Sequence, residues 1–440
     1  MPVHPRPDRT PVVLLTGLDR TGVARLARAA AAPGTTVVTV DLRDVADGQV
    51  IRTSHRIAPD GREELTVDHI VIEHGCVSCT LRFDLLPELR RLHRDAGTAR
   101  IAVALDPAIE PELLCTELHQ VVVSGPGMPD GPAGLDVSVE ATVCAIDAPS
   151  WLGSATGDVT LTEAGLTGLE DERTLAQVAV GQARFADALI VEGADGVEDM
   201  WQLVRLHAVL LRLAPAAGMR TLNSRQPLTA GILDDALGSV GADAPRGRPR
   251  RPFDPLLAGR PELSRDCGVQ LSLFEAARPF HPHRLHEAFD VLLDGVVTAY
   301  GRLWLASAPD DVLWLESAGG GLGIGRVGRW LACDDGTEDA GAHLPDHERE
   351  YRALAALAWD PVYGDRHTSL AVLTHRADPA EIETALQAAL VTDDEFARGP
   401  GYLSALDSPI GDRHTDPCTD REPNEPTIDT ATTTENGENR

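Results

Sequence analysis

The sequence contains no lysine, so arginine supplies all 39 of its basic residues. Any mechanism that needs a lysine ammonium group is therefore excluded. Positive charge is scarce overall, because 68 acidic residues leave a formal net charge of −29. Contacts to nucleic-acid phosphates need clustered positive charge. We therefore expect no sequence-specific nucleic-acid partner.

Long apolar runs are missing as well, and none reaches the roughly 20 residues that a membrane-spanning helix needs. The apolar stretch near the N-terminus is short and ends at Gly17, which predicts a first β-strand and not a signal peptide. Seven cysteines scattered over 440 residues do not form the framework of a secreted disulfide-rich protein. We expect a cytoplasmic protein with no membrane partner.

The first half of the chain alternates between short apolar runs and helical patterns. Residues 11–17 read "PVVLLTG" and precede a helical pattern, and residues 100–105 read "RIAVAL". Continuous apolar strands that alternate with helices predict a mostly parallel sheet with helices on both faces. We place this α/β domain at residues 11–240.

The second half predicts a smaller domain and a tail. Residues 241–268 are rich in Pro, Arg and Gly and are interpreted as a linker. Residues 269–398 contain β-like runs followed by a helical pattern, which predicts an α+β domain. Residues 399–440 form a polar tail dotted with prolines, which we expect to be disordered and acidic, because it has too few apolar residues to offset its chain entropy.

The turn after the first predicted strand has the spacing of a phosphate-binding loop. In "VVLLTGLDRTGVARL" four residues separate Gly17 from Gly22, and a helical pattern follows. A working loop continues with a lysine for the β- and γ-phosphates and a serine or threonine for magnesium. Val23 and Ala24 occupy those positions. A helix N-terminus alone attracts anions weakly, so GTP hydrolysis by the standard mechanism is not expected.

A pair of cysteines lies between a β-run and a helical pattern in "VIEHGCVSCTLRFDLLPELRRL". Cys76 and Cys79 have the C-x-x-C spacing of half a tetrahedral zinc site, and Glu73 and His74 are candidates to complete it. Ser78 is a poor zinc ligand. A thiol/disulfide sensor and a purely structural turn are the alternatives.

The helix after this pair is expected to begin near Asp84, which places Pro87 in its first turn, where proline is tolerated. Leu85, Leu89 and Leu92 then lie on one buried face. The cysteines would be held at the helix N-terminus, which lowers the pKa of thiols and favours metal binding or redox reactivity.

These segments together resemble the CobW family, which joins a P-loop GTPase domain to a CobW C-terminal domain. The family carries Gly-Cys-x-Cys-Cys followed by Thr-Leu-Arg-x-Asp-Leu, and here Cys76 and Cys79 match the outer cysteines while Ser78 replaces the middle one. The later segments "ARPFHPHRLHEAF" and "GRLWLAS" also match. The resemblance covers roughly residues 11–398 and implies a P-loop GTPase-like parallel sheet plus a smaller α+β domain.

The same resemblance exposes departures at the nucleotide elements. The guanine-reading Asn-Lys-x-Asp motif aligns with Glu192 to Asp195, so only Asp195 is kept. The family's Glu-x-x-Gly segment aligns with residues 104–107, "ALDP". The residues left to contact a nucleotide are Gly17, Gly22 and Asp195. Because so few nucleotide-binding residues are kept, the sequence favours a pseudo-GTPase. Binding of GTP and magnesium stays an open alternative.

The degenerate loop and the "GCVSCTLR" form of the cysteine motif most resemble an actinobacterial branch of the family. The resemblance to that branch implies that the protein recruits a ribosome hibernation factor to ribosomes when zinc is scarce, with weak zinc binding at Cys76 and Cys79. The alternative is a GTP-dependent zinc metallochaperone that delivers metal to a client protein. A plain metal buffer is the third hypothesis.

Overall fold

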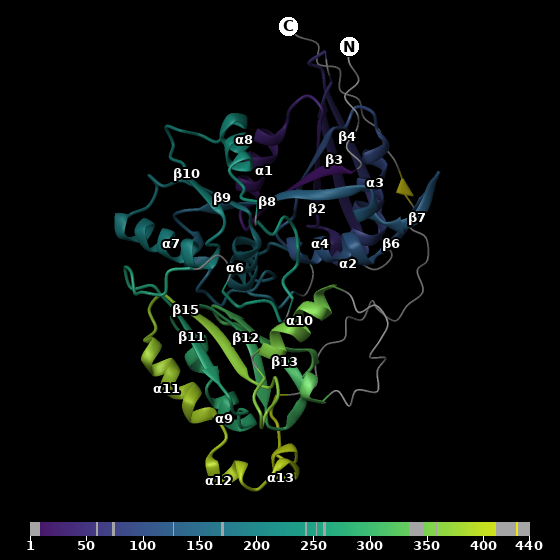
Figure 1. The fold of residues 1–440 in the computed structure, drawn as a ribbon. Helices are drawn as coiled ribbons and strands as arrows, with labels where there is room; N and C mark the ends of the chain where they lie inside the picture. Colours follow the sequence, from purple (N-terminus) through teal and green to yellow (C-terminus); the bar gives the residue numbers. More distant parts are fainter. Residues whose placement is uncertain are drawn as a thin grey trace.

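A nine-stranded sheet forms the centre of the first part of the chain (Figure 1). The computed structural model describes residues 9–429, apart from 59, 73–74, 126, 169–170, 243, 252, 258–260, 334–345, 358 and 411–427. In the order in which they pair, the strands are β10 (Gly218–Thr221), β9 (Ala188–Glu192), β8 (Val137–Asp147), β1 (Thr10–Gly17), β5 (Arg100–Ala104), β2 (Thr35–Asp41), β3 (Gln49–Ile57), β4 (Glu63–Val71) and β16 (Ile428–Asp429).

The strands from β10 to β2 run parallel to one another, and β3, β4 and β16 extend the sheet in antiparallel fashion. The predicted parallel sheet with helices on both faces is thus confirmed. The antiparallel hairpin of β3 and β4 was not predicted. β3 carries half-buried polar side chains and lacks the apolar run by which the other strands were recognised.

Helices cover both faces of this sheet. On β1, Val13 and Leu15 pack in the same cluster as α1 and α8, whereas Val12 and Leu14 pack with α3 and α4. The helical segments of this part are α1 (Arg20–Ala30), η1 (Val45–Asp47), α2 (Val77–Thr80), η2 (Leu81–Leu85), α3 (Leu86–Arg94), α4 (Pro111–Gln120), η3 (Ala133–Leu135), α5 (Trp151–Ser154), α6 (Leu175–Phe185), α7 (Met200–Leu213) and α8 (Ala230–Gly238). The short strands β6 (Val122–Gly125) and β7 (Met128–Pro132) pair with each other.

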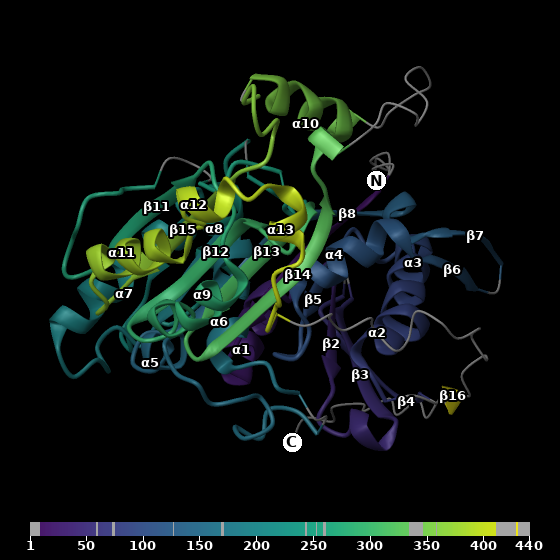
Figure 2. The same cartoon turned by 90° about the horizontal axis from the view of Figure 1, so that it is seen from below.

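The second part of the chain forms an antiparallel sheet of five strands, seen from below in Figure 2. Its strands are, in pairing order, β11 (Gln270–Ala276), β15 (Thr368–Thr374), β12 (Val296–Leu305), β13 (Ala308–Ala318) and β14 (Gly321–Arg329). Its helical segments are α9 (Pro282–Glu287), η4 (Asp290–Leu292), η5 (Leu331–Cys333), α10 (Asp346–Leu357), α11 (Pro379–Ala389), α12 (Asp393–Phe396) and α13 (Pro400–Ser404). This arrangement confirms the predicted α+β architecture.

The two parts share one apolar core. One face of the second sheet packs with α9 and α11, and the other contributes Leu271, Val297 and Ala371 to the cluster that contains α6 and α7 (Figure 1). Arg184 of α6 is half-buried at this junction, where it pairs with Glu316 and lies over the ring of Tyr300 at 4.7 Å. The second sheet is therefore fixed against the first domain.

The predicted linker and tail differ in part from expectation. Within the linker, Leu256 is buried and its carbonyl accepts a hydrogen bond from the hydroxyl of Tyr300, so this segment packs against the second sheet. The helix α13 falls inside the predicted disordered tail, and its Leu403 is buried with Ala306 and Val391. Most of the remaining tail lies outside the described residues. Within the part of the chain that the structure describes, no helix is long and apolar enough to cross a membrane.

Candidate functional site

The predicted phosphate loop is a turn of two residues between β1 and α1, closed by its own side chains. Asp19 caps α1, and its carboxylate accepts hydrogen bonds from the backbone N–H groups of Thr21 and Gly22, both at 2.9 Å. These are the donors that a helix N-terminus would otherwise offer to a phosphate. A carboxylate therefore occupies the anion position of the loop.

The two glycines of the loop have a packing role. A Cβ atom on Gly17 would lie 2.9 Å from the carbonyl oxygen of Ala145, and one on Gly22 would lie 3.1 Å from the Cβ of the same alanine. Ala145 belongs to β8, beside β1 in the sheet. Close approach of the turn to β8 thus accounts for both glycines without a nucleotide.

Two ion pairs bind Arg20 and Arg25 of α1 to residues at or just after the ends of neighbouring strands. Arg20 donates to the buried carboxylate of Asp106 at 2.8 Å and to the carbonyl of Leu166 at 2.6 Å. Arg25 donates from Nε to both carboxylate oxygens of Glu192 at 3.0 Å. The guanidinium groups beside the loop are therefore engaged by carboxylates of the same chain.

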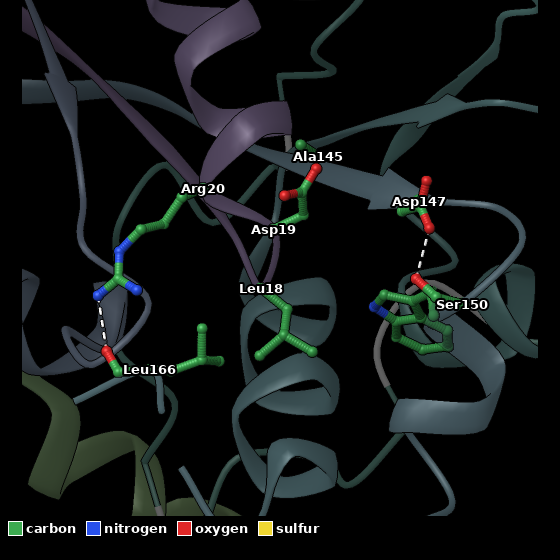
Figure 3. Close-up of a pocket in the computed structure, with 8 residues that line it drawn as sticks. Leu18, Asp19, Arg20, Ala145, Asp147, Ser150 and Leu166 are labelled. Carbon is green, nitrogen blue, oxygen red and sulfur yellow. Dashed lines mark hydrogen bonds between the residues drawn. The ribbon is translucent and has the colours of Figure 1, made fainter. Parts of the chain in front are cut away.

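A cavity of about 290 Å³ remains next to this turn (Figure 3). Its lining includes Asp19, Asp147, Ser150 and Trp151, and the hydroxyl of Ser150 donates to the carboxylate of Asp147. Arg20 lines the same cavity, but its guanidinium group is already paired with Asp106. The net negative charge opposes a polyphosphate ligand.

Asp195, the third predicted nucleotide contact, is not among the residues that line this cavity. It lies in the loop after β9 and accepts hydrogen bonds from the N–H and hydroxyl groups of Ser224, which follows β10. These bonds hold the pKa of Asp195 below its ordinary value. The structure brings Gly17 and Gly22 together at Ala145 and uses Asp195 to join two loops.

The cysteine pair lies at the start of a long helical segment. The Sγ atom of Cys76 caps α2 by accepting the N–H of Cys79 at 3.2 Å, and Thr80 donates its hydroxyl to the carbonyl of Cys76 at 3.1 Å. Cys76 is half-buried and Cys79 is buried. Two thiols, one at the surface and one beneath it, are thus held by the first turn.

The helix starts earlier than predicted. It runs without a break from Val77 through α3, and not from near Asp84. Pro87 lies inside this run, where its ring would clash with a regular helix. The preceding turn is a π-helix in which the N–H of Leu86 bonds to the carbonyl of Leu81, and this wider turn accommodates the proline. The predicted buried face of Leu85, Leu89 and Leu92 is confirmed.

Two glycines that the sequence interpretation missed fix the cysteine loop. A Cβ atom on Gly75 would lie 1.8 Å from the carbonyl oxygen of Val45. Gly48 has a φ of +72°, and a Cβ there would lie 2.6 Å from the carbonyl oxygen of Ile72. The loop that precedes Cys76 therefore packs directly on the turn after β2.

The predicted zinc ligands are only partly placed. Cys76 and Cys79 are brought together, whereas Glu73 and His74 lie outside the described residues. Among the residues that the structure does describe, no group of three or more His, Cys, Asp or Glu side chains has an arrangement that would hold a metal ion. The two thiols fit half of a tetrahedral zinc site, because zinc favours thiolate ligands.

Comparison with known proteins matches both halves of the chain to one family. Residues 24–220 match the model described as "CobW/HypB/UreG, nucleotide-binding domain", and residues 269–390 match "Cobalamin synthesis protein cobW C-terminal domain". "Zinc chaperone Rv0106" of Mycobacterium tuberculosis (strain ATCC 25618 / H37Rv) is 44% identical over 411 residues, which are 93% of this chain and 95% of that protein. The chain belongs to the CobW family.

Two further similarities are weaker. "Zinc-regulated GTPase metalloprotein activator 1" of Dictyostelium discoideum is 23% identical over 375 residues, 82% of this chain and 74% of that protein. The crystal structure of the Zn(II)-bound YjiA GTPase from E. coli superposes loosely, with a TM-score of 0.35 and 14% identity over 88% of this chain and 100% of that one. The nucleotide-domain match begins only at Ala24, after both glycines of the turn.

A buried charge network lies beneath the cysteine helix of this CobW-family protein and was not predicted. Arg52 of β3 pairs with Asp68 at 2.7 Å and with Asp84 of the π-helix, and its distance to Glu88 is 3.8 Å. Arg91 binds Glu88 at 2.6 Å. Asp84 is the acidic residue of the family's Thr-Leu-Arg-x-Asp-Leu motif, and this was the signal available in the sequence.

Asp84 carries the cost of this burial. Desolvation raises its pKa to about 6; Arg52 opposes the shift, and the neighbouring Glu88 and Asp68 carboxylates add to it. Its Oδ2 atom has no hydrogen-bond partner among the described residues. The network therefore places an unfavourable carboxylate on the only described π-helical turn, five residues after Cys79.

Proposed function

We propose that this CobW-family protein handles zinc through Cys76 and Cys79 and works without hydrolysing GTP. The observation that carries the second half of this proposal is the carboxylate of Asp19 at the N-terminus of α1, where a phosphate would bind. The first half rests on the two thiols at the start of α2 and on the high identity to a relative named as a zinc chaperone.

The chemistry of the pair suits transfer or sensing of zinc more than storage. Two thiolates supply half of a tetrahedral site, and positions left to water or to a client leave the metal exchangeable. Ser78, a poor zinc ligand, stands where the family motif has its middle cysteine. A modest affinity of this kind responds to a fall in zinc.

The test is a competition titration of the reduced, metal-free protein with zinc and a chromophoric chelator. We expect one zinc per chain, abolished in Cys76→Ser and in Cys79→Ser. The Ser78→Cys variant serves as the matched control, because it adds a third thiol in the same turn and is expected to bind zinc at least about tenfold more tightly. Wild-type binding that survives both serine variants would place the metal elsewhere and contradict the proposal.

The nucleotide half of the proposal has its own test. Isothermal titration of the purified protein with magnesium-GTP is expected to give no binding up to millimolar nucleotide, with a GTP-competent CobW relative as the positive control. The variant Val23→Lys/Ala24→Thr restores the two missing side chains but leaves Asp19 in place, so it is expected to remain silent. Micromolar binding to the wild type would instead support GTP-dependent zinc delivery, the second candidate.

For the client we propose a ribosome hibernation factor that the protein recruits to ribosomes when zinc is scarce. The motif resemblance supports this assignment, and an adaptor needs no nucleotide cycle, which agrees with the closed turn after β1. In cells starved of zinc, deletion of this gene should remove the hibernation factor from the ribosome fractions of a sucrose gradient. Retention of the factor in the deletion strain would overturn this client.

A further inference from the structure

The two thiols of the cysteine loop are placed for chemistry with each other. The Sγ atom of Cys76 lies 3.2 Å from the backbone nitrogen of Cys79, and both residues carry thiols and not a disulfide. The Cα of Cys79 is one bond of about 1.46 Å beyond that nitrogen. The two cysteines therefore lie within one turn of helix, and side-chain rotations can bring their sulfur atoms toward each other.

The backbone at Cys76 allows the approach that a disulfide needs. Residues three apart on a regular helix have Cβ atoms about 5–6 Å apart, whereas a disulfide needs roughly 3.5–4.5 Å. Cys76 is not helical, since its φ of −143° and ψ of 157° are extended. It precedes the first turn and can move toward Cys79 without breaking the helix.

The two thiols also differ in access in the way that stepwise exchange requires. Cys76 is half-buried at the surface, and Cys79 is 9% exposed beneath it. A soluble oxidant therefore meets Cys76 first. Cys79 is then the internal thiol that resolves the first product.

We propose that Cys76 and Cys79 form a reversible dithiol/disulfide couple that exchanges with low-molecular-weight disulfides. The Cys76 thiolate attacks one sulfur of a small disulfide, forming a mixed disulfide and expelling one small thiolate. The Cys79 thiolate then attacks the Cys76 sulfur, forming the internal disulfide and expelling the second. Two electrons pass from the cysteine pair to the small disulfide, and the two thiol protons end on the two small thiols.

The other described cysteines do not share these features. Cys115 on α4 and Cys144 on β8 are 0% and 1% exposed, and burial raises the pKa of both thiols. Cys267 donates a hydrogen bond to Asp266, and this bond raises the pKa of its thiol. Burial, together with a hydrogen bond donated to Asp310, raises the pKa of the Cys333 thiol. The pair at α2 is the place where this chain sets two thiols side by side in the described structure.

If the pair binds zinc as in the proposed function, the redox state of the pair controls zinc binding. A disulfide sulfur is no thiolate, so oxidation removes both sulfur ligands at once. Bound zinc in turn shields the thiolates from exchange. Zinc and disulfide are therefore alternative states of one turn, and oxidation would mimic zinc shortage.

The experiment uses the full chain with Cys267→Ser, Cys333→Ser and Cys418→Ser as background, freed of metal. The protein is equilibrated in buffers of rising oxidised-to-reduced glutathione ratio, quenched with acid, alkylated and cleaved with trypsin. Cleavage after Arg62 and Arg82 places both cysteines on the peptide "EELTVDHIVIEHGCVSCTLR". We expect a cooperative loss of both alkylation sites from that peptide and their return with dithiothreitol.

Two single variants in this background test the order of attack. Cys79→Ser leaves the accessible thiol and should accumulate a mixed disulfide with glutathione, whereas Cys76→Ser leaves the buried thiol and should resist modification. Absence of the internal disulfide at every ratio, or equal modification of the two variants, would overturn the proposal. A disulfide without zinc binding to the reduced protein would refute only the zinc function, and zinc binding without a disulfide would refute only the redox couple.

Discussion

The turn after β1 and the turn before α2 have similar backbone arrangements but differ in the chemistry of the side chain that caps the following helix. Each joins a strand to a helix, contains a glycine pressed against a neighbouring backbone or strand, and caps the helix with its own side chain. In the first turn the cap is the carboxylate of Asp19, and Arg20 and Arg25 are held by acidic partners. In the second the cap is the sulfur of Cys76, a second thiol follows one turn later, and the surface thiol remains accessible.

The difference lies in the group that caps each helix. A carboxylate cap and internal ion pairs stabilise a fold but exclude the anion for which the turn is spaced. A sulfur cap leaves a thiol, which under the proposed function is both a nucleophile and a metal ligand. The match to the CobW-type nucleotide-binding domain includes this thiol and begins only after the two glycines of the first turn.

The largest effect should come from the glycine of the cysteine turn. Gly75→Ala forces a Cβ to within 1.8 Å of the Val45 carbonyl oxygen, so the loop must move. We expect a loss of about 3 kcal/mol in the free energy of unfolding, measured by urea denaturation. Gly153→Ala on α5 is the control, because its added Cβ meets nothing within 4 Å, and it should be neutral or slightly stabilising. Equal stability of the two variants would contradict the packing of this loop.

The next effect concerns pH and Asp84. Its folded pKa of about 6 lies above the ordinary value of 3.8, so the folded state binds the proton more tightly. Asp84 therefore stabilises the folded state by on the order of 3 kcal/mol in unfolding free energy below about pH 4. This stabilisation is lost as the pH rises through 6. Asp84→Asn should flatten that part of the unfolding free energy against pH relative to wild type. Asp234→Asn, at an exposed position on α8, should reproduce the wild-type slope, and an unchanged slope in Asp84→Asn would refute the assignment.

The smallest effect is expected at the turn after β1. Asp19→Ala removes the cap of α1 and should cost about 1 kcal/mol in thermal or chemical unfolding. Asp19→Asn keeps a capping oxygen without the charge and should lose only a few tenths. If alanine and asparagine cost the same, the negative charge and not the cap would be what stabilises the turn.

Much of the fold followed from local patterns in the sequence. Apolar runs such as those of β1 and β5 are buried on both faces, and the spacing of Leu85, Leu89 and Leu92 fixed one side of a helix. The strand β3 was missed because its side chains are mostly polar. Partners such as Asp68 and Asp84, which bind Arg52 of β3, lie on other elements and cannot be seen in the local pattern. The helix start was misplaced because Pro87 is a poor interior residue unless a π-turn precedes it.

The contacts made by the residues of the two turns could not be predicted from the sequence. The spacing of Gly17 and Gly22 indicated a phosphate loop, yet only β8, distant in sequence, shows that Ala145 demands both glycines. Nothing local to Asp19 distinguishes a cap from a surface carboxylate. The network around Asp84 joins β3, β4 and the helix, so no single segment contains it.

The shared core of the two sheets has a consequence for how the molecule can be taken apart. Leu271 and Ala371 fill the same apolar cluster as α6 and α7, and Arg184 of α6 pairs with Glu316 of β13 beside that cluster. A fragment that ends before residue 269 would leave that cluster bare to water and the arginine without its acidic partner. We therefore expect either half to be less stable when it is expressed without the other, because each would expose apolar surface that the whole chain buries.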